Sequence, residues 1–321
     1  MAVDPLSDLF KTVRLTGAVF FEIAAADPWA IGSPAPEQIL PKILSRADHL
    51  IAYHVVTTGK CFATTREGEA IALEAGQVIM FTSGQPHIMS SSPNMPADPP
   101  MPDVLEVATS GEKPFHINFG SGAASVRLVC GYLACDARPY NPLLENLPPV
   151  IKAGDPHNKG EDLIAQFIRF AVSEAADKHA GSESVLTKLS ELMFIDVVRR
   201  YLENLPAEQA GWLAGLRDPL VGKALSLMHA KPAHDWTLDE LGKQAGLSRS
   251  VLAERFTHFV GIPPMQYLAK WRMQIAAELL TGGSANVANI AGQVGYASEA
   301  AFSRAFKKLI GVAPSVWRRK C

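Results

Sequence analysis

The sequence predicts an α+β protein of two domains, a β-rich N-terminal half followed by an all-α C-terminal half. Two observations lead to this prediction. Short apolar segments separated by Gly and Pro turns fill the first 150 residues, and a helix-turn-helix pattern occurs twice in the last hundred. A length of 321 residues is sufficient for two domains, each with its own core.

The N-terminal strands are marked by β-branched residues and by the turns that end them. Residues 49–58 (HLIAYHVVTT) run into Gly59, and residues 77–82 (QVIMFT) follow the turn Ala75-Gly76. The remaining expected strands are residues 61–65, 87–89 and 125–133, with an exposed Pro-rich and Ser-rich loop at 90–114. Short strands with such turns favour a barrel or a jelly roll over residues 1–150.

Residues 151–205 change to a helical period and predict an αα-hairpin. Leu163, Phe167 and Phe170 should lie along one face of its first helix. The second helix is apolar over a wide arc that comprises Leu186, Leu189, Leu192, Met193, Ile195, Val197 and Val198. This surface must be covered either by the β-rich domain or by a second copy of the chain in a dimer. Residues 206–215 are the expected linker.

Residues 216–321 contain the same short pattern twice. Ser248, Phe256, Gly261 and Pro264 of the first copy match Ser298, Phe306, Gly311 and Pro314 of the second, and each matching pair is 50 residues apart. Each copy predicts a short amphipathic helix, a Gly-centred turn and a second helix that begins after a Ser N-cap. The two helix-turn-helix units are expected at about 237–259 and 287–309.

A longer helix should join the two units. It begins with Pro264 in its first turn and runs to about Leu280. Its roughly 17 residues would span about 25 Å. Such a helix can hold two recognition helices apart by nearly the ~34 Å repeat of successive major grooves.

Charge separates the two halves in the same way. Residues 216–321 hold 14 of the 30 Lys and Arg residues but only 7 of the 32 Asp and Glu residues, a net charge of +7. Residues 1–215 keep 16 basic and 25 acidic side chains, a net charge of −9. A basic half with a duplicated helix-turn-helix indicates a nucleic-acid partner.

Other features of composition indicate a cytoplasmic protein without a membrane partner. No apolar run approaches the roughly 18 residues that span a bilayer. The N-terminus MAVDPLSDLFKTVR has no apolar core typical of a secretory signal. The four cysteines are not spaced as in a small disulfide scaffold, so a reduced compartment is expected.

Three C-terminal segments resemble the DNA-binding domain of AraC/XylS-type transcriptional regulators. They are LDELGKQAGLSRSVLAERF, GIPPMQYLAKWRMQIAAELL and IAGQVGYASEAAFSRAFKKLIGVAPSVWRR. The resemblance extends from Leu238 to Arg318. It implies an activator that binds double-stranded promoter DNA in a sequence-specific way, with RNA polymerase as a further partner.

The N-terminal half resembles the cupin-like sensor domain of one AraC subgroup. The residues that carry this looser resemblance are Tyr53-His54-Val55-Val56, Leu73-Glu74-Ala75-Gly76-Gln77, Gln85-Pro86-His87, Leu128-Val129-Cys130-Gly131 and Asn141-Pro142-Leu143-Leu144. The usual Gly-Asp of such a turn is Gly76-Gln77 here, and the two-His-plus-Glu metal cluster of enzymatic cupins is missing. The resemblance therefore implies a sensor more than an enzyme.

Carried over by position, the recognition helices are residues 248–259 and 298–309. The first should present Ser248, Arg249, Ser250, Ala253, Glu254 and Thr257 over a core of Val251, Leu252 and Phe256. The second should present Ser298, Glu299, Ala300, Ala301, Ser303, Arg304, Lys307 and Lys308 over a core of Phe302 and Phe306. Arg304 suits guanine, since its planar fork can bond O6 and N7 together.

Other basic residues fit phosphate better than bases. Arg249, Arg272, Lys307 and Lys308 are the expected phosphate contacts, which set register and affinity. Glu254 has two interpretations, because it either accepts from cytosine N4 or forms an ion pair with Arg255 or another neighbour. Lys270, Arg318, Arg319 and Lys320 fit solvated surface.

The sensor half contains one candidate metal site. His54, His87 and Cys130 lie on segments that the cupin resemblance brings together, and imidazoles with a thiolate are a plausible Zn²⁺ set, with Cys61 as a possible fourth ligand. Such a thiolate would also respond to oxidants. The alternative is buried histidines bonded to backbone carbonyls and cysteines that pack as small apolar side chains.

Three classes of function follow. The first is a transcription regulator, and not an enzyme, whose N-terminal domain senses a small molecule, a metal or an oxidant, as a possible homodimer. The second is a cupin-type metalloenzyme with an accessory DNA-binding domain. The third is an architectural DNA binder without an effector, which a sensor-sized N-terminal half of about 200 residues disfavours.

Overall fold

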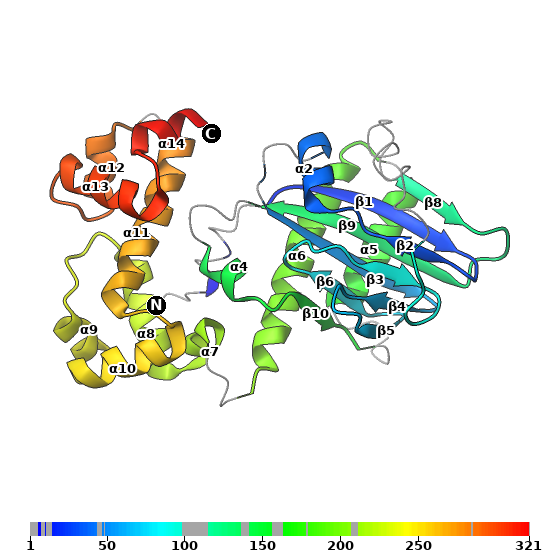
Figure 1. The fold of residues 1–321 in the computed structure, drawn as a ribbon, viewed down its shortest axis with the longest axis horizontal. Helices are drawn as coiled ribbons and strands as arrows, with labels where there is room; N and C mark the ends of the chain where they lie inside the picture. The colour runs from blue at the N-terminus through cyan, green and yellow to red at the C-terminus, as the bar shows by residue number, and fades with distance from the viewer. Residues whose placement is uncertain are drawn as a thin grey trace. The chain divides into compact units, whose positions relative to one another are not determined.

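A computed structural model gives the fold of the chain (Figure 1). It describes residues 6–7, 10, 15–43, 47, 49–97, 115–135, 141–155, 163–177, 179–206, 211–283 and 285–320. Most of the expected loop 90–114 lies outside these residues. The chain divides into two compact bodies, one formed by Arg14–Asp136 with Pro148–Asn204, and the other by Met1–Val13, Ala137–Leu147 and Leu205–Cys321. They are named below the β-rich body and the helical body.

The β-rich body contains two β-sheets. The larger has the order β10-β6-β3-β9-β1-β8 and the smaller has the order β2-β7-β4-β5. The strands of the larger sheet are β1 (Leu15–Ala25), β3 (His49–Thr58), β6 (Val78–Phe81), β8 (Phe115–Phe119), β9 (Val126–Cys135) and β10 (Val150–Ala153). Those of the smaller sheet are β2 (Ala30–Gly32), β4 (Lys60–Thr64), β5 (Ala70–Glu74) and β7 (Ile88–Ser90). Helix α2 (Pro36–Ile43) lies between β2 and β3 along the chain.

Of the two expected arrangements, a closed barrel is not formed by the described strands. In the described residues the two sheets are not joined by strand pairing, and each keeps free edges, at β10 and β8 in one sheet and at β2 and β5 in the other. The sequence pattern predicts strands and turns but does not contain the pairing between strands that decides closure. An apolar core that includes Trp29, Ile31, Leu73, Phe81 and Leu128 lies between the sheets.

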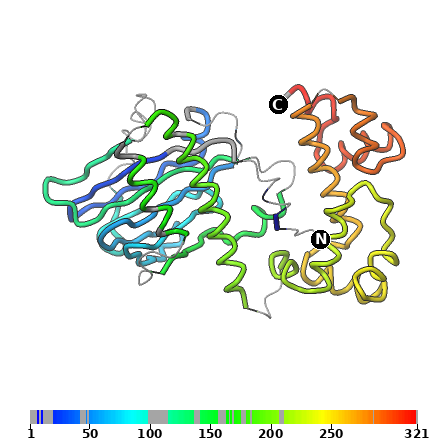
Figure 2. The backbone as a smooth tube through the Cα atoms, turned by 180° about the vertical axis from the view of Figure 1, so that it is seen from behind, coloured from blue at the N-terminus to red at the C-terminus, as the bar shows by residue number. Residues whose placement is uncertain are grey.

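Two helices cover the larger sheet. Helix α5 (Leu163–Asp177) contacts β9, and α6 (Ser182–Glu203) contacts β1 and β10 (Figure 2). The hydroxyl of Tyr53 on β3 lies 3.0 Å from that of Ser190 on α6, and both residues are buried. Packing on the β-rich domain therefore accounts for one side of the predicted hairpin.

The buried face of α5 differs from the one that the sequence pattern predicts. Ile164, Phe167 and Ala171 are buried, whereas Leu163 and Phe170 are exposed, Phe170 by 59%. The spacing of positions 163, 167 and 170 fits one helix face, but so does that of 164, 167 and 171, and the sheet decides between them. On α6, Leu192 is 50% exposed, although the sequence analysis placed it in the apolar arc.

The helical body contains α4 (Pro142–Asn146) and the C-terminal helices. These are α7 (Trp212–Arg217), α8 (Pro219–Ala230), α9 (Leu238–Ala245), α10 (Arg249–Val260), α11 (Pro264–Gly282), α12 (Val287–Gln293), α13 (Glu299–Ile310) and α14 (Pro314–Lys320). The expected linker 206–215 thus includes the start of α7, where Trp212 is buried. Among the helices that the structure describes, none is long and apolar enough to cross a membrane.

Candidate nucleic-acid interface and N-terminal pocket

Two pairs of short helices form the helix-turn-helix units. In each pair the second helix begins after a serine, because the hydroxyl of Ser248 accepts from the amide of Val251 at 3.4 Å and that of Ser298 accepts from Ala301 at 3.2 Å. Glycines in the left-handed conformation, Gly261 and Gly311, end both helices. The 50-residue repeat in the sequence therefore corresponds to the same capping chemistry used twice.

The turn of the second unit requires a glycine for a further reason. Gly295 has a φ of +80°, and a Cβ at this position would lie 2.6 Å from the carbonyl oxygen of Ala233. The loop before α9 and the turn before α13 therefore approach each other closely. Helix α11, 19 residues long and thus about 28 Å, runs between the two units.

The recognition helices present most of the residues that the sequence predicts. Arg249, Ser250, Glu254 and Thr257 are exposed on α10, and Ala253 is half-buried. On α13 the exposed residues are Glu299, Ala300, Arg304, Lys307 and Lys308, and Ala301 and Ser303 are half-buried. Leu252 and Phe256, like Phe302 and Phe306, are buried.

Val251 differs from its prediction. It was expected in the core, but it is 45% exposed. Leu252 and Phe256 point into the core. Successive residues of an α-helix are rotated by about 100°, so the side chain of Val251 points away from that core. An exposed apolar residue on a recognition helix is suited to contact the methyl group of thymine. Sequence periodicity could have identified it, since 252 and 256 are spaced by four whereas 251 is not.

The ion pair with Arg255, one of the interpretations of Glu254, is not formed. Arg255 does not pair with it but binds the carboxylate of Asp218, with its Nε 3.2 and 3.1 Å from the two oxygens. No ion pair of Glu254 occurs among the residues that the structure describes. The carboxylate therefore remains exposed on the recognition face.

Arg272 and Arg318 have structural partners that the sequence analysis did not anticipate. Arg272 donates from Nε to the carbonyl of Pro232 and from Nη2 to that of His234, both at 2.7 Å. Burial lowers the pKa of its guanidinium. Arg318, expected as solvated surface, donates to the carbonyl of Ala285 at 2.5 Å. Arg272 therefore fastens the loop before α9 to α11, in addition to any role toward phosphate.

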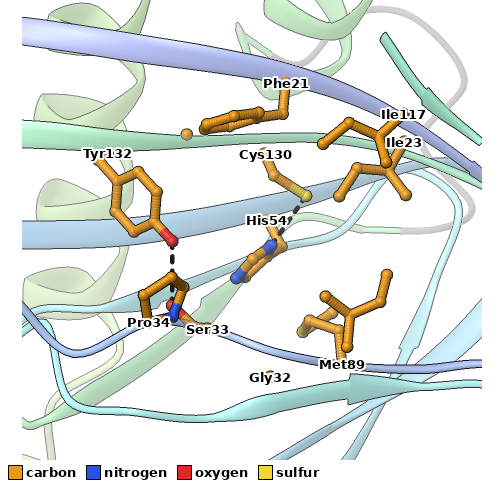
Figure 3. A pocket seen from close by; sticks show the side chains of 12 residues that line it. Phe21, Ile23, Gly32, Ser33, Pro34, His54, Met89, Ile117, Cys130 and Tyr132 are labelled. Atoms are coloured by element: carbon orange, nitrogen blue, oxygen red, sulfur yellow. Dashed lines mark hydrogen bonds between the residues drawn. The ribbon is translucent and has the colours of Figure 1, made fainter. Parts of the chain in front are cut away.

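In the β-rich body, His54, His87 and Cys130 do come together, as Figure 3 shows for His54 and Cys130. His54 on β3 lies directly opposite Cys130 on β9 in the strand register. Its Nδ1 is 2.8 Å from the sulfur of Cys130, and its Nε2 is 2.6 Å from Nε2 of His87. His87 stacks on Phe81 with ring centroids 3.5 Å apart. The contact between the two histidines joins the two sheets.

The hydrogen bond of His87 to a backbone carbonyl decides which nitrogen atoms of this cluster carry protons. Nδ1 of His87 lies 2.8 Å from the carbonyl of Gln85, so this nitrogen must donate. Burial lowers the pKa of His87 to about 4 and that of His54 well below its usual range, so both rings are neutral near pH 7. Nε2 of His87 then accepts from His54, and Nδ1 of His54 accepts from the thiol of Cys130.

This arrangement does not support the predicted Zn²⁺ set. The ring of His54 lies between its two partners and uses opposite nitrogens for them, so the three donors do not face one point. In the part of the chain that the structure describes, no group of three or more His, Cys, Asp or Glu residues is placed to hold a metal ion. Burial also raises the pKa of Cys130, and that of Cys61 to about 12, which favours thiols over reactive thiolates.

A pocket opens beside this cluster (Figure 3). Its cavity volume is about 30 Å³, and about 450 Å³ of space is counted only when the open solvent at the mouth is included. The lining is mainly apolar and comprises Phe21, Ile23, Ile31, Gly32, Ser33, Pro34, His54, Met89, Ile117, Cys130, Gly131 and Tyr132. The hydroxyls of Tyr132 and Ser33 lie 3.1 Å apart. The lining contains neutral polar groups and no Asp, Glu, Lys or Arg.

Comparisons with known proteins agree with both halves. A cupin family model matches residues 4–203, and a helix-turn-helix domain model matches residues 241–320. A putative AraC-like transcription regulator of Streptomyces antibioticus is 32% identical over 99% of both chains. One from Streptomyces lividans is 31% identical over 99% of this chain and 98% of that protein.

A more distant relative, the HTH-type transcriptional regulator AlkR of Acinetobacter baylyi, is 27% identical over 99% of this chain and 100% of that protein. The relatives are regulators, which points to a non-enzyme and against the metalloenzyme alternative. Matched along nearly its full length by these proteins, and built as a cupin-like domain followed by two helix-turn-helix units, the chain belongs to the AraC family of DNA-binding transcription regulators.

Proposed function

We propose that the cupin-like domain of this regulator senses a small, uncharged and mainly apolar molecule, which occupies the pocket beside His54 and Cys130. The observation that carries the proposal is the lining of this pocket. Apolar side chains surround it, and its polar groups are a neutral imidazole, a thiol and hydroxyls. A charged ligand would lose its hydration without gaining an opposite charge.

Ligand-induced stabilisation tests this proposal. The full chain is heated with pairs of compounds that differ in charge, such as benzyl alcohol against benzoate and hexanol against hexanoate. Uncharged members should raise the melting temperature, since a ligand at 100 times its Kd stabilises the native state by about 2.7 kcal/mol. Stabilisation by the charged members alone would contradict the proposal.

Two substitutions on one strand localise the effect. Ile117 lines the pocket, whereas Phe119, two residues farther along β8, does not. Ile117→Trp should fill the mouth of the pocket and abolish the ligand-induced shift, and Phe119→Trp should retain it. An equal response of both variants would place the ligand elsewhere.

We further infer that the regulator binds promoter DNA as a homodimer, next to RNA polymerase. The exposed apolar residues of the hairpin support a dimer. Leu163 and Phe170 lie seven residues apart on α5, as do Val185 and Leu192 on α6, so each pair lies on one side of its helix. These four residues are named the hairpin stripe.

A further inference from the structure

The two helix-turn-helix units pack on different parts of α11 (Figure 1). In its first half, Tyr267 packs edge-on against Phe256 of the first unit, with ring centroids 5.7 Å apart. In its second half, Met273 belongs to the apolar core of the second unit, together with Phe302. Arg272 directly precedes Met273. It therefore lies on α11 at the boundary between the surfaces that the two units use.

The side chain of Arg272 contacts both units. Its Nε and Nη2 donate to the carbonyls of Pro232 and His234, both at 2.7 Å. These carbonyls belong to residues 231–236, which lead into the first unit and are named the brace loop. The guanidinium carbon of Arg272 lies 5.9 Å from the ring centroid of Tyr296, in the turn of the second unit. One side chain thus binds the loop in front of the first unit and contacts the turn inside the second.

The brace loop also touches the second unit directly. A Cβ on Gly295 would have its three nearest neighbours in the backbone of Ala233, at 2.6 to 3.0 Å. The loop is held in shape by its own hydrogen bonds, since the buried indole of Trp236 donates to the carbonyl of Lys231 at 3.0 Å. The packing of each unit on α11 is mainly apolar and non-directional, whereas hydrogen bonds are directional. The brace loop is therefore a second connection between the units, in addition to α11.

A second arginine offers a comparison. The pair Trp-Arg occurs on α11 as Trp271-Arg272 and on α14 as Trp317-Arg318. Arg318 donates from Nη2 to the carbonyl of Ala285, which precedes α12 of its own unit. Among the described residues, no hydrogen bond or ring contact joins Arg318 to the first unit. Both arginines thus bind the loop in front of their own unit, and Arg272 contacts the other unit as well.

We propose that Arg272 is a positioning residue for DNA binding, which acts with the brace loop to hold the two helix-turn-helix units at one separation. Successive major-groove segments lie about 34 Å apart, and one inserted base pair moves the second segment by about 3.4 Å and turns it by about 35°. Units held by both α11 and the brace loop cannot follow such a displacement. Arg272 therefore determines the spacing between the two base sequences that one chain reads. This role is independent of the pocket and its ligand.

The spacing preference of the full chain tests this role. Wild type, Arg272→Ala and Arg318→Ala are titrated with a duplex selected by the wild-type chain. They are also titrated with the same duplex carrying one extra base pair between the two contacted segments. The measured quantity is the ratio of the two Kd values. A loss of folded protein raises both Kd values by the same factor, so the ratio reports the geometry of the units and not the stability of the chain.

The three proteins should give different ratios. The wild-type ratio should be about tenfold or more, because a single disrupted base contact already costs roughly that factor. Arg272→Ala should lower the ratio by about fivefold, the effect of one lost hydrogen bond. Arg318→Ala should retain the wild-type ratio, even where its affinity for both duplexes falls.

Arg272→Lys separates positioning from contact with phosphate. Lysine keeps the charge but lacks the planar fork that binds two carbonyls. A positioning role predicts that Arg272→Lys lowers the ratio as Arg272→Ala does. A phosphate contact instead predicts that Arg272→Ala reduces the salt slope of binding by about 0.9, that Arg272→Lys restores it, and that both keep the wild-type ratio. This second result would overturn the proposal.

Two glycines test the same contact from the second unit. Gly295 and Gly246 occupy equivalent turns with φ of +80° and +85°, but a Cβ on Gly246 would meet nothing within 4 Å. Gly295→Ala should force the turn away from Ala233 and lower the ratio, whereas Gly246→Ala should not. If Gly295→Ala does not fold, the Arg272 variants decide. A wild-type ratio in Arg272→Ala, or a selected duplex that one unit alone contacts, would contradict the positioning role.

Discussion

At the residue scale, the exposed faces of the two expected recognition helices carry different chemistry. The first presents Val251 and Glu254, and the second presents Arg304 with Lys307 and Lys308. Bidentate contacts of arginine specify guanine, whereas lysines contact phosphates as point charges. The sequence alone was sufficient to place these basic residues on the exposed helix faces. The Ser N-caps define where each helix begins, and the position of every later residue around the helix follows. The sequence did not reveal that Val251 is exposed or that Arg272 binds two carbonyls, since both depend on tertiary neighbours.

Arg304→Ala tests base reading. Loss of a bidentate contact should cost about 1–3 kcal/mol at the cognate site and relax the preference at one base pair. Lys308→Ala is the matched control, which should weaken all sequences alike. Binding is measured by titration of cognate and scrambled duplexes after selection of bound DNA. Equal losses on both duplexes for Arg304→Ala would assign this side chain to the backbone instead.

Asp218 is a second residue whose environment makes a prediction. It caps α8 by accepting from the amides of Leu220 and Val221 at 3.1 and 2.9 Å, and it binds Arg255. Burial raises its pKa, but hydrogen bonds from Arg255 and the two amides outweigh this and leave the pKa below 3.8. Asp218→Ala should lower the free energy of unfolding by about 1–2 kcal/mol through the lost cap.

Asp218→Asn separates the charge from the cap, since asparagine caps equally well. Because the folded-state pKa is lowered, the charge stabilises the native state above the unfolded pKa of about 3.9, and this contribution disappears as the pH falls through the folded value. Urea denaturation should show wild type more stable than Asp218→Asn at pH 7, with a smaller difference at pH 3. A difference that does not depend on pH would contradict the ion pair.

At the element scale, the sequence predicted local structure better than pairing. The bounds of β3 and the helices of both helix-turn-helix units follow from turns, caps and periodicity, which act within a few residues. Three other features depend on residues distant in the sequence. They are the split into two open sheets, the face that α5 buries, and the contact of α4 with α7. The histidine cluster could be predicted only in part. The resemblance indicated that His54, His87 and Cys130 lie together, but it did not indicate which of their atoms donate and which accept hydrogen bonds.

The hairpin stripe makes a prediction about assembly. Phe170→Glu and Leu192→Glu should each weaken self-association by roughly tenfold or more, because central apolar residues dominate most interfaces. Sedimentation equilibrium of the full chain measures this. Leu309→Glu, which changes an exposed leucine on α13, is the control and should leave the dimer intact. A wild-type chain that sediments as a monomer at tens of micromolar would remove the proposed dimer.

At the scale of the whole molecule, charge is divided between an acidic N-terminal half and a basic DNA-binding half. The net charge of +7 on residues 216–321 attracts DNA, and the net charge of −9 on residues 1–215 disfavours contact of the N-terminal half with DNA. Residues 216–321 alone should bind duplex DNA. A fragment of residues 211–321 should be more stable than the fragment 216–321, because it keeps the buried Trp212.

The salt dependence of DNA binding tests the central claim most directly. The affinity of the full chain for a selected duplex is measured across a range of salt concentrations, for wild type and for Lys307→Ala with Lys308→Ala. The logarithm of the binding constant should fall steeply with the logarithm of salt, and each lost phosphate contact should reduce the slope by about 0.9. A slope near zero, or one that the double substitution leaves unchanged, would contradict DNA binding through contacts between phosphates and the helix-turn-helix units.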